Sequence, residues 1–252
     1  MKFYYISDLH LPFYINLRSE KVSKYIKSNF IASDAKTSNI IVAGDVSEYS
    51  NQIKTTLDTL AHYYESVFFV FGNHDLYLVS KTQKELYKGS STSKIAEIKD
   101  YFKFFPNVYI LNNEQVNYKG KTIAGSRLWY SIPDSDLSSY KANIADSEYL
   151  FEKENGSPWS IYSKEDKAFY DSLSAVDLMI THIPPIHPRA SLHRYNSAFT
   201  ALVSELKSTK WVCGHQHLNT IEEVAGTTFY MNPKGYPNEL TARDFKLEYF
   251  YL

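Results

Sequence analysis

Five apolar, β-rich runs along the chain stop abruptly at polar or glycine residues. The runs are KFYYIS (2–7), NIIVAG (39–44), SVFFVF (66–71), VDLMIT (176–181) and KWVCG (210–214). Nearly continuous apolar character is typical of strands that are buried on both faces of a helix-covered sheet. Segments of helical length and mixed polarity, 18–31 and 50–64, separate the first three runs. The pattern therefore predicts βαβ units in an α/β fold.

The rest of the chain predicts one more helix, several hairpins and an interruption. Residues 91–105 are typical of a helix that Pro106 would end. Alternating segments with Lys-Gly and Ala-Gly steps predict antiparallel hairpins, among them 114–126 and 220–233. Segment 127–175 is rich in serine, tyrosine and charge, and predicts an insertion with one helix near 163–174. Two interpretations of this insertion stay open: a lid or substrate-binding cap, or a loosely packed surface excursion.

Composition and charge restrict the class of protein. The 252 residues are 44% hydrophobic and 22% charged, which predicts one soluble α/β domain over residues 1–252 with a possible cap at about 127–175. The net charge of −1 argues against nucleic-acid binding by bulk electrostatics, although it leaves room for a locally basic cleft.

The cysteine count and the first residues bear on location. Cys213 is the only cysteine, which rules out an intramolecular disulfide and fits a reducing compartment. The opening MKFYYISDLH lacks the long apolar stretch of a signal peptide, and no run of 18 apolar residues occurs in the sequence. We therefore expect a cytoplasmic protein with no membrane contact.

Polar side chains that can bind metals follow each of the five apolar runs. In chain order they are Asp8 and His10, Asp45 and Glu48, Asn73 with His74 and Asp75, His182, and finally His215 and His217. In parallel α/β sheets, ligands bind beyond the carboxyl ends of the strands. Each short motif alone has an ordinary explanation in turns and helix caps. Their joint occurrence at five strand ends predicts a common site.

The chemistry of this set indicates two metal ions. Imidazole and carboxylate ligands without thiolates suit divalent Mn, Fe, Zn, Co or Ni. Seven or eight ligands exceed one tetrahedral site, but they fit two metals about 3.5–4 Å apart that share a bridging carboxylate. Such a pair is the machinery of phosphate-ester hydrolysis.

The ordered motifs D-x-H (8–10), G-D (44–45), G-N-H-D (72–75), T-H (181–182) and G-H-x-H (214–217) resemble the calcineurin-like metallophosphoesterase superfamily. The tail YMNPKGYP (230–237) resembles the Asn-Pro segment of many members. The resemblance implies a four-layer α/β/β/α sandwich of two mixed β-sheets flanked by helices. It also implies a dinuclear hydrolase in which a metal-bound hydroxide attacks a phosphomonoester or phosphodiester, with manganese the favoured metal.

The resemblance also assigns roles by motif position. Asp8, His10 and His217 would bind the first metal; Asn73, His182 and His215 would bind the second; and Asp45 would bridge both. His74 resembles the general acid that protonates the leaving group. The second motif continues as GDVSEYS, with Tyr49 where protein phosphatases carry a phosphate-binding arginine, so a phosphoprotein substrate is disfavoured.

Some assignments have alternatives. Glu48 would either orient His74 or favour a helix N-terminus through its charge. Arg127, in GSRLWY (125–130), is a candidate substrate contact. The loop IPPIHPRASLHR (183–194) would form either a positive rim or a solvated loop.

Alternative functions also remain. The expected substrate is a small phosphorylated molecule, with a nucleotide among the candidates. The alternatives are a nuclease acting on nucleic acid and a non-catalytic metal-binding scaffold on the same fold. The sequence identifies neither the substrate nor the native metal pair nor the oligomeric state.

Overall fold

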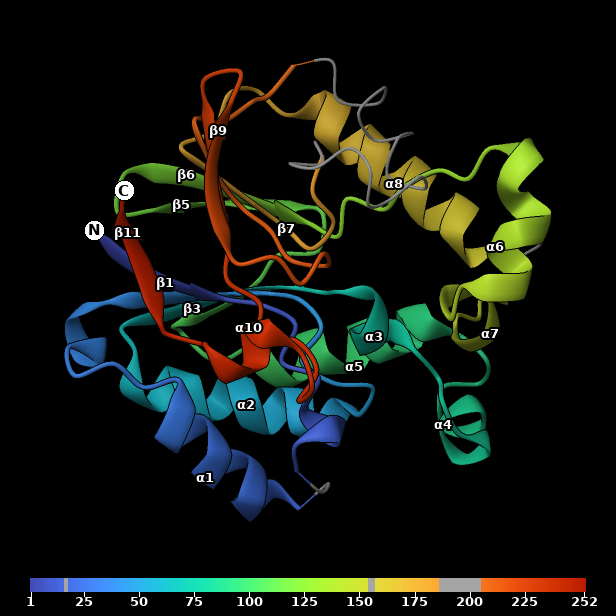
Figure 1. Cartoon of the computed structure of the whole chain (residues 1–252), viewed down its shortest axis with the longest axis horizontal. Helices are drawn as coiled ribbons and strands as arrows, with labels where there is room; N and C mark the ends of the chain where they lie inside the picture. Colours follow the sequence, from blue (N-terminus) through green and yellow to red (C-terminus); the bar gives the residue numbers. More distant parts are fainter. Residues whose placement is uncertain (16–17, 154–156, 186–204) are drawn as a thin grey trace.

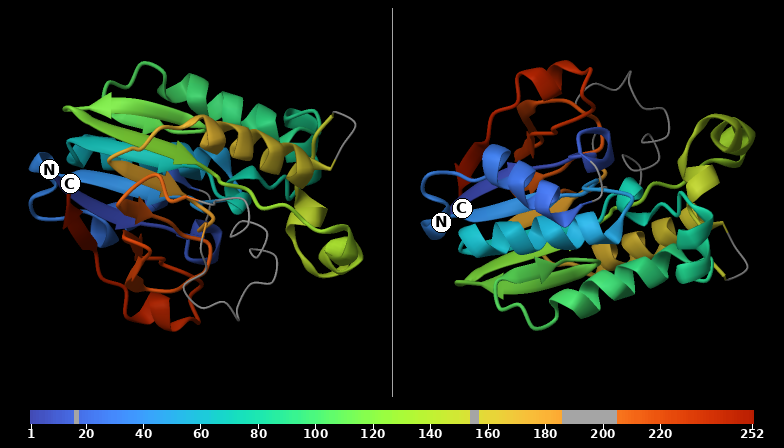
Figure 2. Two further views of the ribbon diagram at one scale, coloured as in Figure 1. Left: turned by 90° about the horizontal axis from the view of Figure 1, so that it is seen from above. Right: turned by 90° about the horizontal axis from the view of Figure 1, so that it is seen from below.

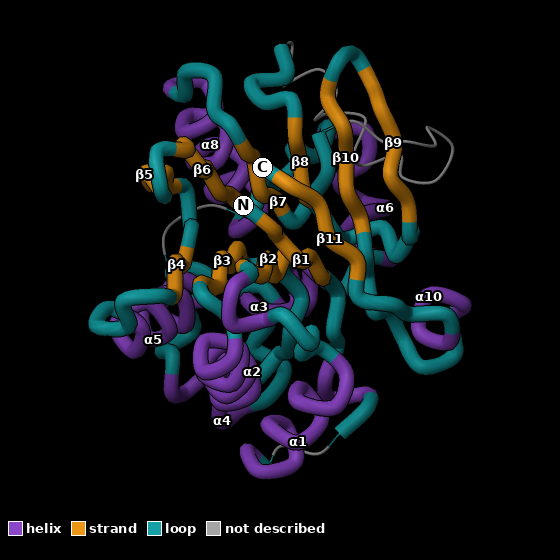
Figure 3. Tube along the Cα trace, turned by 90° about the vertical axis from the view of Figure 1, so that its left-hand side faces the viewer, coloured by secondary structure: helices purple, strands orange, loops and turns teal. Residues whose placement is uncertain are grey.

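The computed structural model describes residues 1–15, 18–153, 157–185 and 205–252. Two mixed sheets pack face to face, and helices lie on their outer sides (Figures 1 and 3). This arrangement confirms the predicted four-layer α/β/β/α sandwich. Among the described residues, none of the helices is long and apolar enough to cross a bilayer.

The first sheet contains five strands in the order β11-β1-β2-β3-β4. Its strands are β1 (Lys2–Ile6), β2 (Asn39–Ala43), β3 (Ser66–Val70), β4 (Val108–Ile110) and β11 (Glu248–Tyr251). Neighbours from β1 to β4 are parallel, whereas β11 runs antiparallel to β1, with Lys2 opposite Tyr251. The apolar runs at 2–7, 39–44 and 66–71 thus form the predicted buried strands.

The second sheet contains six strands in the order β5-β6-β7-β8-β10-β9. They are β5 (Glu114–Tyr118), β6 (Lys121–Ser126), β7 (Leu178–Thr181), β8 (Lys210–Val212), β9 (Thr220–Val224) and β10 (Thr227–Met231). The β5–β6 and β9–β10 pairs are antiparallel hairpins, as the alternating segments predicted. Strands β6, β7, β8 and β10 are parallel, so the sheet is mixed.

Helices cover the outer face of each sheet (Figure 2). The longer helices are α1 (Ser19–Asn29), α2 (Ser50–Tyr63), α5 (Ser91–Phe102) and α8 (Pro158–Ser172). The shorter ones are α3 (Asn73–Leu76), α4 (Lys81–Leu86), α6 (Leu137–Asn143), α7 (Asp146–Tyr149) and α10 (Leu240–Arg243). Helices α1, α2 and α5 lie against the first sheet, and α8 lies against the second (Figure 1).

Side-chain alternation along β1 explains why its strand had to be apolar on both faces. Phe3 and Tyr5 point into the cluster between the two sheets, together with residues such as Val212 and Ile180. Tyr4 and Ile6 point the other way, into the cluster under the helices. Successive residues of a strand face opposite sides, so a strand in a covered layer needs apolar residues at every position.

The 127–175 segment holds more structure than the single helix predicted near 163–174. It contains α6, α7 and the longer helix α8, which forms the crossover between the parallel strands β6 and β7. Trp159, Tyr162 and Tyr170 of α8 are buried in the core. This packing argues against a loosely packed excursion for the α8 part of the segment.

The loop after β1 is held by the end of the β10 region. The backbone N–H of Ser7 donates to Asn232 O at 3.2 Å, and those of Lys234 and Gly235 donate to Ser7 O and Asp8 O, both at 2.9 Å. Residues more than 220 positions apart along the chain therefore fix the turn that carries Asp8.

Candidate metal centre

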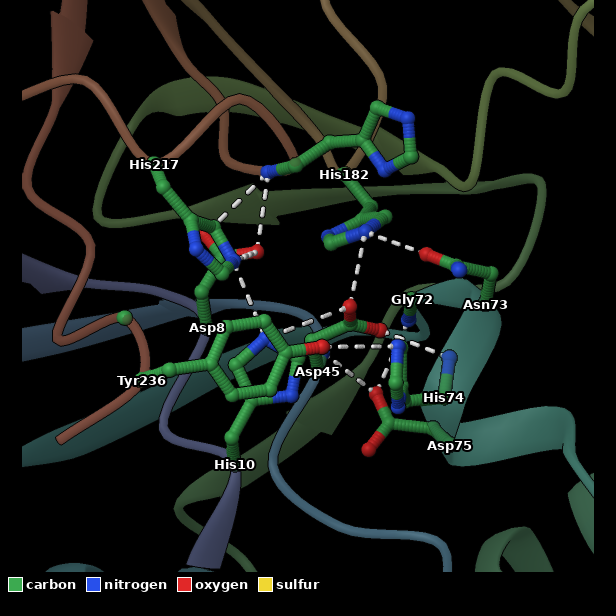
Figure 4. Close-up of polar contacts among 12 residues, drawn as sticks. Asp8, His10, Asp45, Gly72, Asn73, His74, Asp75, His182, His217 and Tyr236 are labelled. Carbon is green, nitrogen blue, oxygen red and sulfur yellow. Dashed lines mark hydrogen bonds and ion pairs between the residues drawn. The ribbon is translucent and has the colours of Figure 1, made fainter. Parts of the chain in front are cut away.

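Five loops deliver the predicted site residues to one edge of the sandwich (Figure 4). The loops follow β1, β2, β3, β7 and β8, so the site lies at the carboxyl ends of the parallel strands. A cavity of about 330 Å³ opens there, lined by His10, Asp45, Asn73, His74, His215, Gln216, His217, Tyr236 and Glu239. The structure thus brings together the residues that the five motifs predicted.

The first group of ligand atoms comes from Asp8, His10 and His217, which lie within 4.8 Å of one another. The Nε2 atoms of His10 and His217 are 3.0 Å apart, and His217 Nε2 is 3.5 Å from Asp8 Oδ1. On the opposite side of its ring, His217 Nδ1 donates to Glu239 Oε2 at 2.7 Å. This contact leaves Nε2 to face the group, as is typical of metal-binding histidines.

The second group contains Asp8, Asp45 and His182. His182 Nδ1 is 2.9 Å from Ala43 O, a pure acceptor, so this nitrogen carries a hydrogen. The other nitrogen, Nε2, is 3.0 Å from Asn73 Oδ1 and 3.4 Å from Asp45 Oδ2. Asn73, although it is not an ionisable group, therefore also faces this position with its carbonyl oxygen.

Asp45 lies between the two groups. Its Oδ2 is 3.4 Å from His182 Nε2 and 3.9 Å from His10 Nε2, while its Oδ1 accepts the backbone N–H of His74 at 2.8 Å. Burial disfavours the charged form, but His182 and its neighbours hold the pKa of Asp45 well below its ordinary value. Asp45 is thus an anionic carboxylate within reach of both groups.

His215 lies beside the second group. Its ring centroid is 5.2 Å from that of His182, and its backbone N–H donates to Asp8 Oδ1 at 3.0 Å. Among the labelled ligands of Figure 4, Asn73 and His182 lie on one side of Asp45, and His10 and His217 lie on the other.

Several predicted ligands have an unusual backbone. Positive φ angles occur at Asp8 (52°), His10 (42°), Asp45 (56°), His215 (72°) and His217 (46°). This left-handed conformation costs about 1–2 kcal/mol for a residue with a Cβ, although Asp and His tolerate it better than most. Clustering of strained positions at one place points to function.

The loops after β2 and β3 touch at Gly72. A Cβ at this position would lie 2.1 Å from Asp45 Oδ1, so only glycine fits. Asp75 holds both loops together, because its carboxylate accepts the backbone N–H groups of Asp45, Val46, Ser47 and Gly72 at 2.8–3.1 Å. The buried Asp75 therefore braces the turn that presents Asn73 and His74.

His74 has a different environment from the predicted ligands. Its Nδ1 is 2.7 Å from Glu48 Oε1, and its Nε2 faces the Tyr236 hydroxyl at 3.4 Å. Burial favours neutral imidazole, but the carboxylates of Asp45 and Glu48 outweigh it and raise the pKa of His74. His74 also belongs to a third group that could hold a metal, with His10 and Asp45. Its Nδ1 is already engaged by Glu48.

The donor set fits metal ions, because its close contacts need added positive charge, supplied either by a second proton on a buried histidine or by a bound cation. His182 Nε2 faces two oxygen acceptors, and the Nε2 atoms of His10 and His217 face each other. The anionic surroundings raise the pKa of His182 to about 10 and that of His217 to about 9, against the effect of burial. Divalent cations would satisfy these oxygen and nitrogen atoms, with neutral histidines as ligands.

Arg127 lies apart from this group. Its side chain is 2% exposed, and Nη2 is 2.7 Å from Asp166 Oδ1 and 3.1 Å from Glu165 Oε2 of α8. An arginine buried in such a pair is not free to bind a substrate, so the structure favours a role in holding α8 over the predicted substrate contact. The predicted rim residues His187, Arg189, His193 and Arg194 lie outside the described residues.

Three residues around the site escaped sequence reasoning. Glu239 orients His217, and the Tyr236 ring stacks on His10 with centroids 4.3 Å apart. Asp146 of α7 accepts a hydrogen bond from Asn73 Nδ2 at 3.0 Å. Tyr236 lies in the tail motif 230–237, which was a usable signal, whereas nothing local distinguishes Glu239 or Asp146.

Known proteins resemble this chain in sequence and in fold. A sequence model of the family described as calcineurin-like phosphoesterase matches residues 1–219. The uncharacterized protein L509 of Acanthamoeba polyphaga mimivirus is 22% identical over 263 residues, which cover 93% of this chain and 91% of that protein. The crystal structure of phosphopantetheinyl hydrolase from Mycobacterium tuberculosis is similar in fold, with a TM-score of 0.67 and 19% identity, over 99% of this chain and 95% of that one.

Proposed function

Because this chain belongs to the calcineurin-like phosphoesterase family, we propose that it hydrolyses a phosphomonoester or phosphodiester at the metal centre. Family membership makes the chain a hydrolase acting on phosphate ester bonds. The observation that carries the finer proposal is the convergence of five loops on one cavity, where three groups of histidine and aspartate residues each hold their ligand atoms within 4.8 Å of one another.

The proposed metal ligands follow the two groups. Asp8, His10 and His217 would hold one divalent ion; Asn73, His182 and His215 would hold the other; and Asp45 would contact both. Two such ions supply positive charge for the phosphoryl oxygens and lower the pKa of water. Nitrogen and oxygen donors are compatible with Mn, Fe, Zn, Co and Ni, and we propose manganese as the first metal to test.

His74 is the proposed general acid. Glu48 accepts from Nδ1 and so directs Nε2 toward the cavity, where Nε2 can donate its proton to the departing oxygen. The raised pKa of His74 favours the protonated ring that this role requires. The Tyr236 hydroxyl, beside Nε2, would donate a hydrogen bond to the phosphoryl group, since burial and nearby carboxylates raise its pKa and keep it protonated.

The cavity suits a small substrate. Among the described residues, its walls include no lysine or arginine, so metal ions, His74 and Tyr236 would carry most of the recognition of a phosphate. The net charge of −1 also disfavours a polynucleotide. We propose that the substrate is a small phosphorylated molecule, with nucleotides among the candidates. We also propose that the chain is a single domain and acts in the cytoplasm.

The test is metal-dependent hydrolysis. Protein stripped with a chelator is assayed with p-nitrophenyl phosphate and bis-p-nitrophenyl phosphate, before and after adding Mn²⁺, Fe²⁺, Co²⁺, Ni²⁺ or Zn²⁺. We expect no turnover without metal and recovery with at least one ion, and the preferred ester separates a monoesterase from a diesterase. Absence of turnover with every ion would contradict the proposal. A second set of substrates contains nucleotides and a phosphopantetheinyl ester. The ester is included because a phosphopantetheinyl hydrolase is similar in fold to this chain.

Competition by single-stranded DNA separates the small-molecule esterase from a nuclease. At low salt, we expect single-stranded DNA to leave ester hydrolysis uninhibited, even at concentrations that saturate proteins that bind DNA nonspecifically. Strong, salt-dependent inhibition would favour the nuclease instead.

A further inference from the structure

Asp146, the first residue of α7, is a buried carboxylate that sits directly behind the metal centre. Asp146 is only 1% exposed. It accepts hydrogen bonds from the hydroxyls of Tyr77 (2.5 Å), Tyr130 (2.6 Å) and Tyr140 (3.3 Å). In the part of the chain that the structure describes, no ion pair to Asp146 occurs. A buried carboxylate is retained only when hydrogen bonds compensate its lost hydration, and neutral donors do so here.

The two carboxylate oxygens of Asp146 accept hydrogen bonds from different parts of the chain. Oδ2 receives the hydroxyls of Tyr130 and Tyr140, which belong to the same 127–175 segment. Oδ1 receives Tyr77 and, at 3.0 Å, the amide nitrogen of Asn73. Oδ1 of Asp146 therefore connects the 127–175 segment to Asn73, a proposed metal ligand at the start of α3.

The hydrogen bond between Asn73 and Asp146 determines which end of the Asn73 amide faces the metal position. Nδ2 donates to Asp146 Oδ1 and to the Tyr77 hydroxyl at 2.9 Å, so Oδ1 of Asn73 points to His182 Nε2 at 3.0 Å (Figure 4). An amide turned by 180° would present its NH₂ group, a pair of donors, to the metal position. Such a group repels a cation instead of binding it.

We propose that Asp146 is a positioning residue for the second metal, through which the 127–175 segment sets the affinity of that position. The proposal rests on the ligand role given to Asn73 under the proposed function. It makes the segment more than a structural crossover, because the packing of α7 against Tyr77 becomes part of the metal site.

Metal binding to the metal-free chain tests the proposal without reference to turnover. Isothermal titration of full-length protein with Mn²⁺ is compared for the wild type, Asp146→Asn and the control Tyr140→Phe. We expect Asp146→Asn to weaken one class of Mn²⁺ site about 10–100-fold and leave the other unchanged, as outer-shell partners of metal ligands usually do. Tyr140→Phe removes a hydrogen bond to the other oxygen and should leave both classes unchanged.

Exchanging the amide and the carboxylate between positions 73 and 146 tests whether Mn²⁺ affinity can be rescued. Asn73→Asp alone places two carboxylates 3.0 Å apart in place of the present contact, and should also weaken the second site. In the double variant Asn73→Asp/Asp146→Asn the donor and acceptor change places, so one oxygen of residue 73 again faces the metal. We expect Mn²⁺ affinity within about tenfold of the wild type.

The outcomes separate this inference from the proposed function. Unchanged Mn²⁺ affinity in folded Asp146→Asn would overturn the positioning role while leaving the function intact. Equal weakening of both sites in Asp146→Asn and Tyr140→Phe, or no rescue in the exchange, would also overturn it, since a merely structural role predicts those results. Failure of the wild type to bind Mn²⁺ would contradict the proposed function itself. Thermal unfolding of each metal-free variant checks that it is folded.

Discussion

The Arg127–Asp166 cluster and the cluster at the strand ends are both buried and charged, and they differ in how their polar atoms are paired. In the Arg127–Asp166 cluster every contact joins a donor to an acceptor. Arg127 donates to Asp166 from Nη2 at 2.7 Å and from Nε at 3.3 Å. Asn113 Nδ2 and the Trp129 backbone N–H supply further donors to Asp166 at 2.7 and 2.8 Å. The charges balance and the geometry is complete.

In the cluster at the strand ends, the contacts join donors to acceptors only when His182 and His217 carry a second ring proton. His182 Nε2 faces oxygens of Asn73 and Asp45, and His10 and His217 turn nitrogens toward each other. That positive charge can come from protons or from metal ions held by neutral histidines, and the family of the chain favours metal ions. The difference teaches that buried charge alone does not mark a functional site. Converging histidines and carboxylates that need an added positive charge do.

The first prediction sharpens this comparison at the proposed acid. His74→Ala should lower kcat by about 10²–10⁴-fold, because proton donation to the leaving group is lost. Two Mn²⁺ ions should still bind, since the change leaves the seven proposed ligands in place. Steady-state kinetics and metal analysis measure the two effects, with the exposed His62→Ala as the matched control. A variant that holds only one Mn²⁺ would instead make His74 a ligand.

The second prediction breaks the balanced cluster. Arg127→Met should lower the free energy of unfolding by about 3–5 kcal/mol, because Asp166 would remain buried with its charge uncompensated. Chemical denaturation measures this change, and the activity of the folded fraction should persist. Lys167→Met, which removes an exposed pair with Asp171, should cost at most about 1 kcal/mol. A raised KM with unchanged stability would restore Arg127 as a substrate contact.

The third and smallest prediction concerns the orientation of His74. Glu48→Gln should lower kcat/KM about 10–100-fold, as the loss of an orienting partner usually does. The acid must be protonated, so the rate falls as pH rises through the pKa of His74. Glu48 helps to raise that pKa, and its removal should move the alkaline limb to lower pH. The exposed Glu85→Gln is the control; an unmoved limb in Glu48→Gln would leave Glu48 with a helix-terminal role only.

The strands and the convergence of the candidate site residues were predictable because both leave local signals. A strand in a covered layer must be apolar at every position, and SVFFVF forms β3 as expected. The catalytic candidates follow such runs directly, so Asn73 and His74 could be placed at a sheet edge from the order of residues alone. The hairpin 220–233 was likewise signalled by its alternation and its Ala-Gly step.

The supporting contacts were not predictable, because they join distant segments through side chains. Asp146 is 73 positions from Asn73, and Glu239 is 22 positions from His217. The prediction for Arg127 had the same weakness, because its partner Asp166 is 39 positions away on a helix whose start was placed too late. Sequence pattern finds groups that a strand presents, but not the partners that orient or neutralise them.

The antiparallel pairing of β1 with β11 has a consequence for biosynthesis. Strand β1 leaves the ribosome long before Tyr251, its neighbour across Lys2, and the turn at Asp8 also depends on residues 232–235. At about 5–20 residues per second, roughly ten to fifty seconds separate the two strands. During that interval the edge of β1 is open and the first metal position has no fixed Asp8. A nascent chain should therefore bind no metal at the proposed first position until residues 232–235 and β11 have docked on β1 and the loop that follows it.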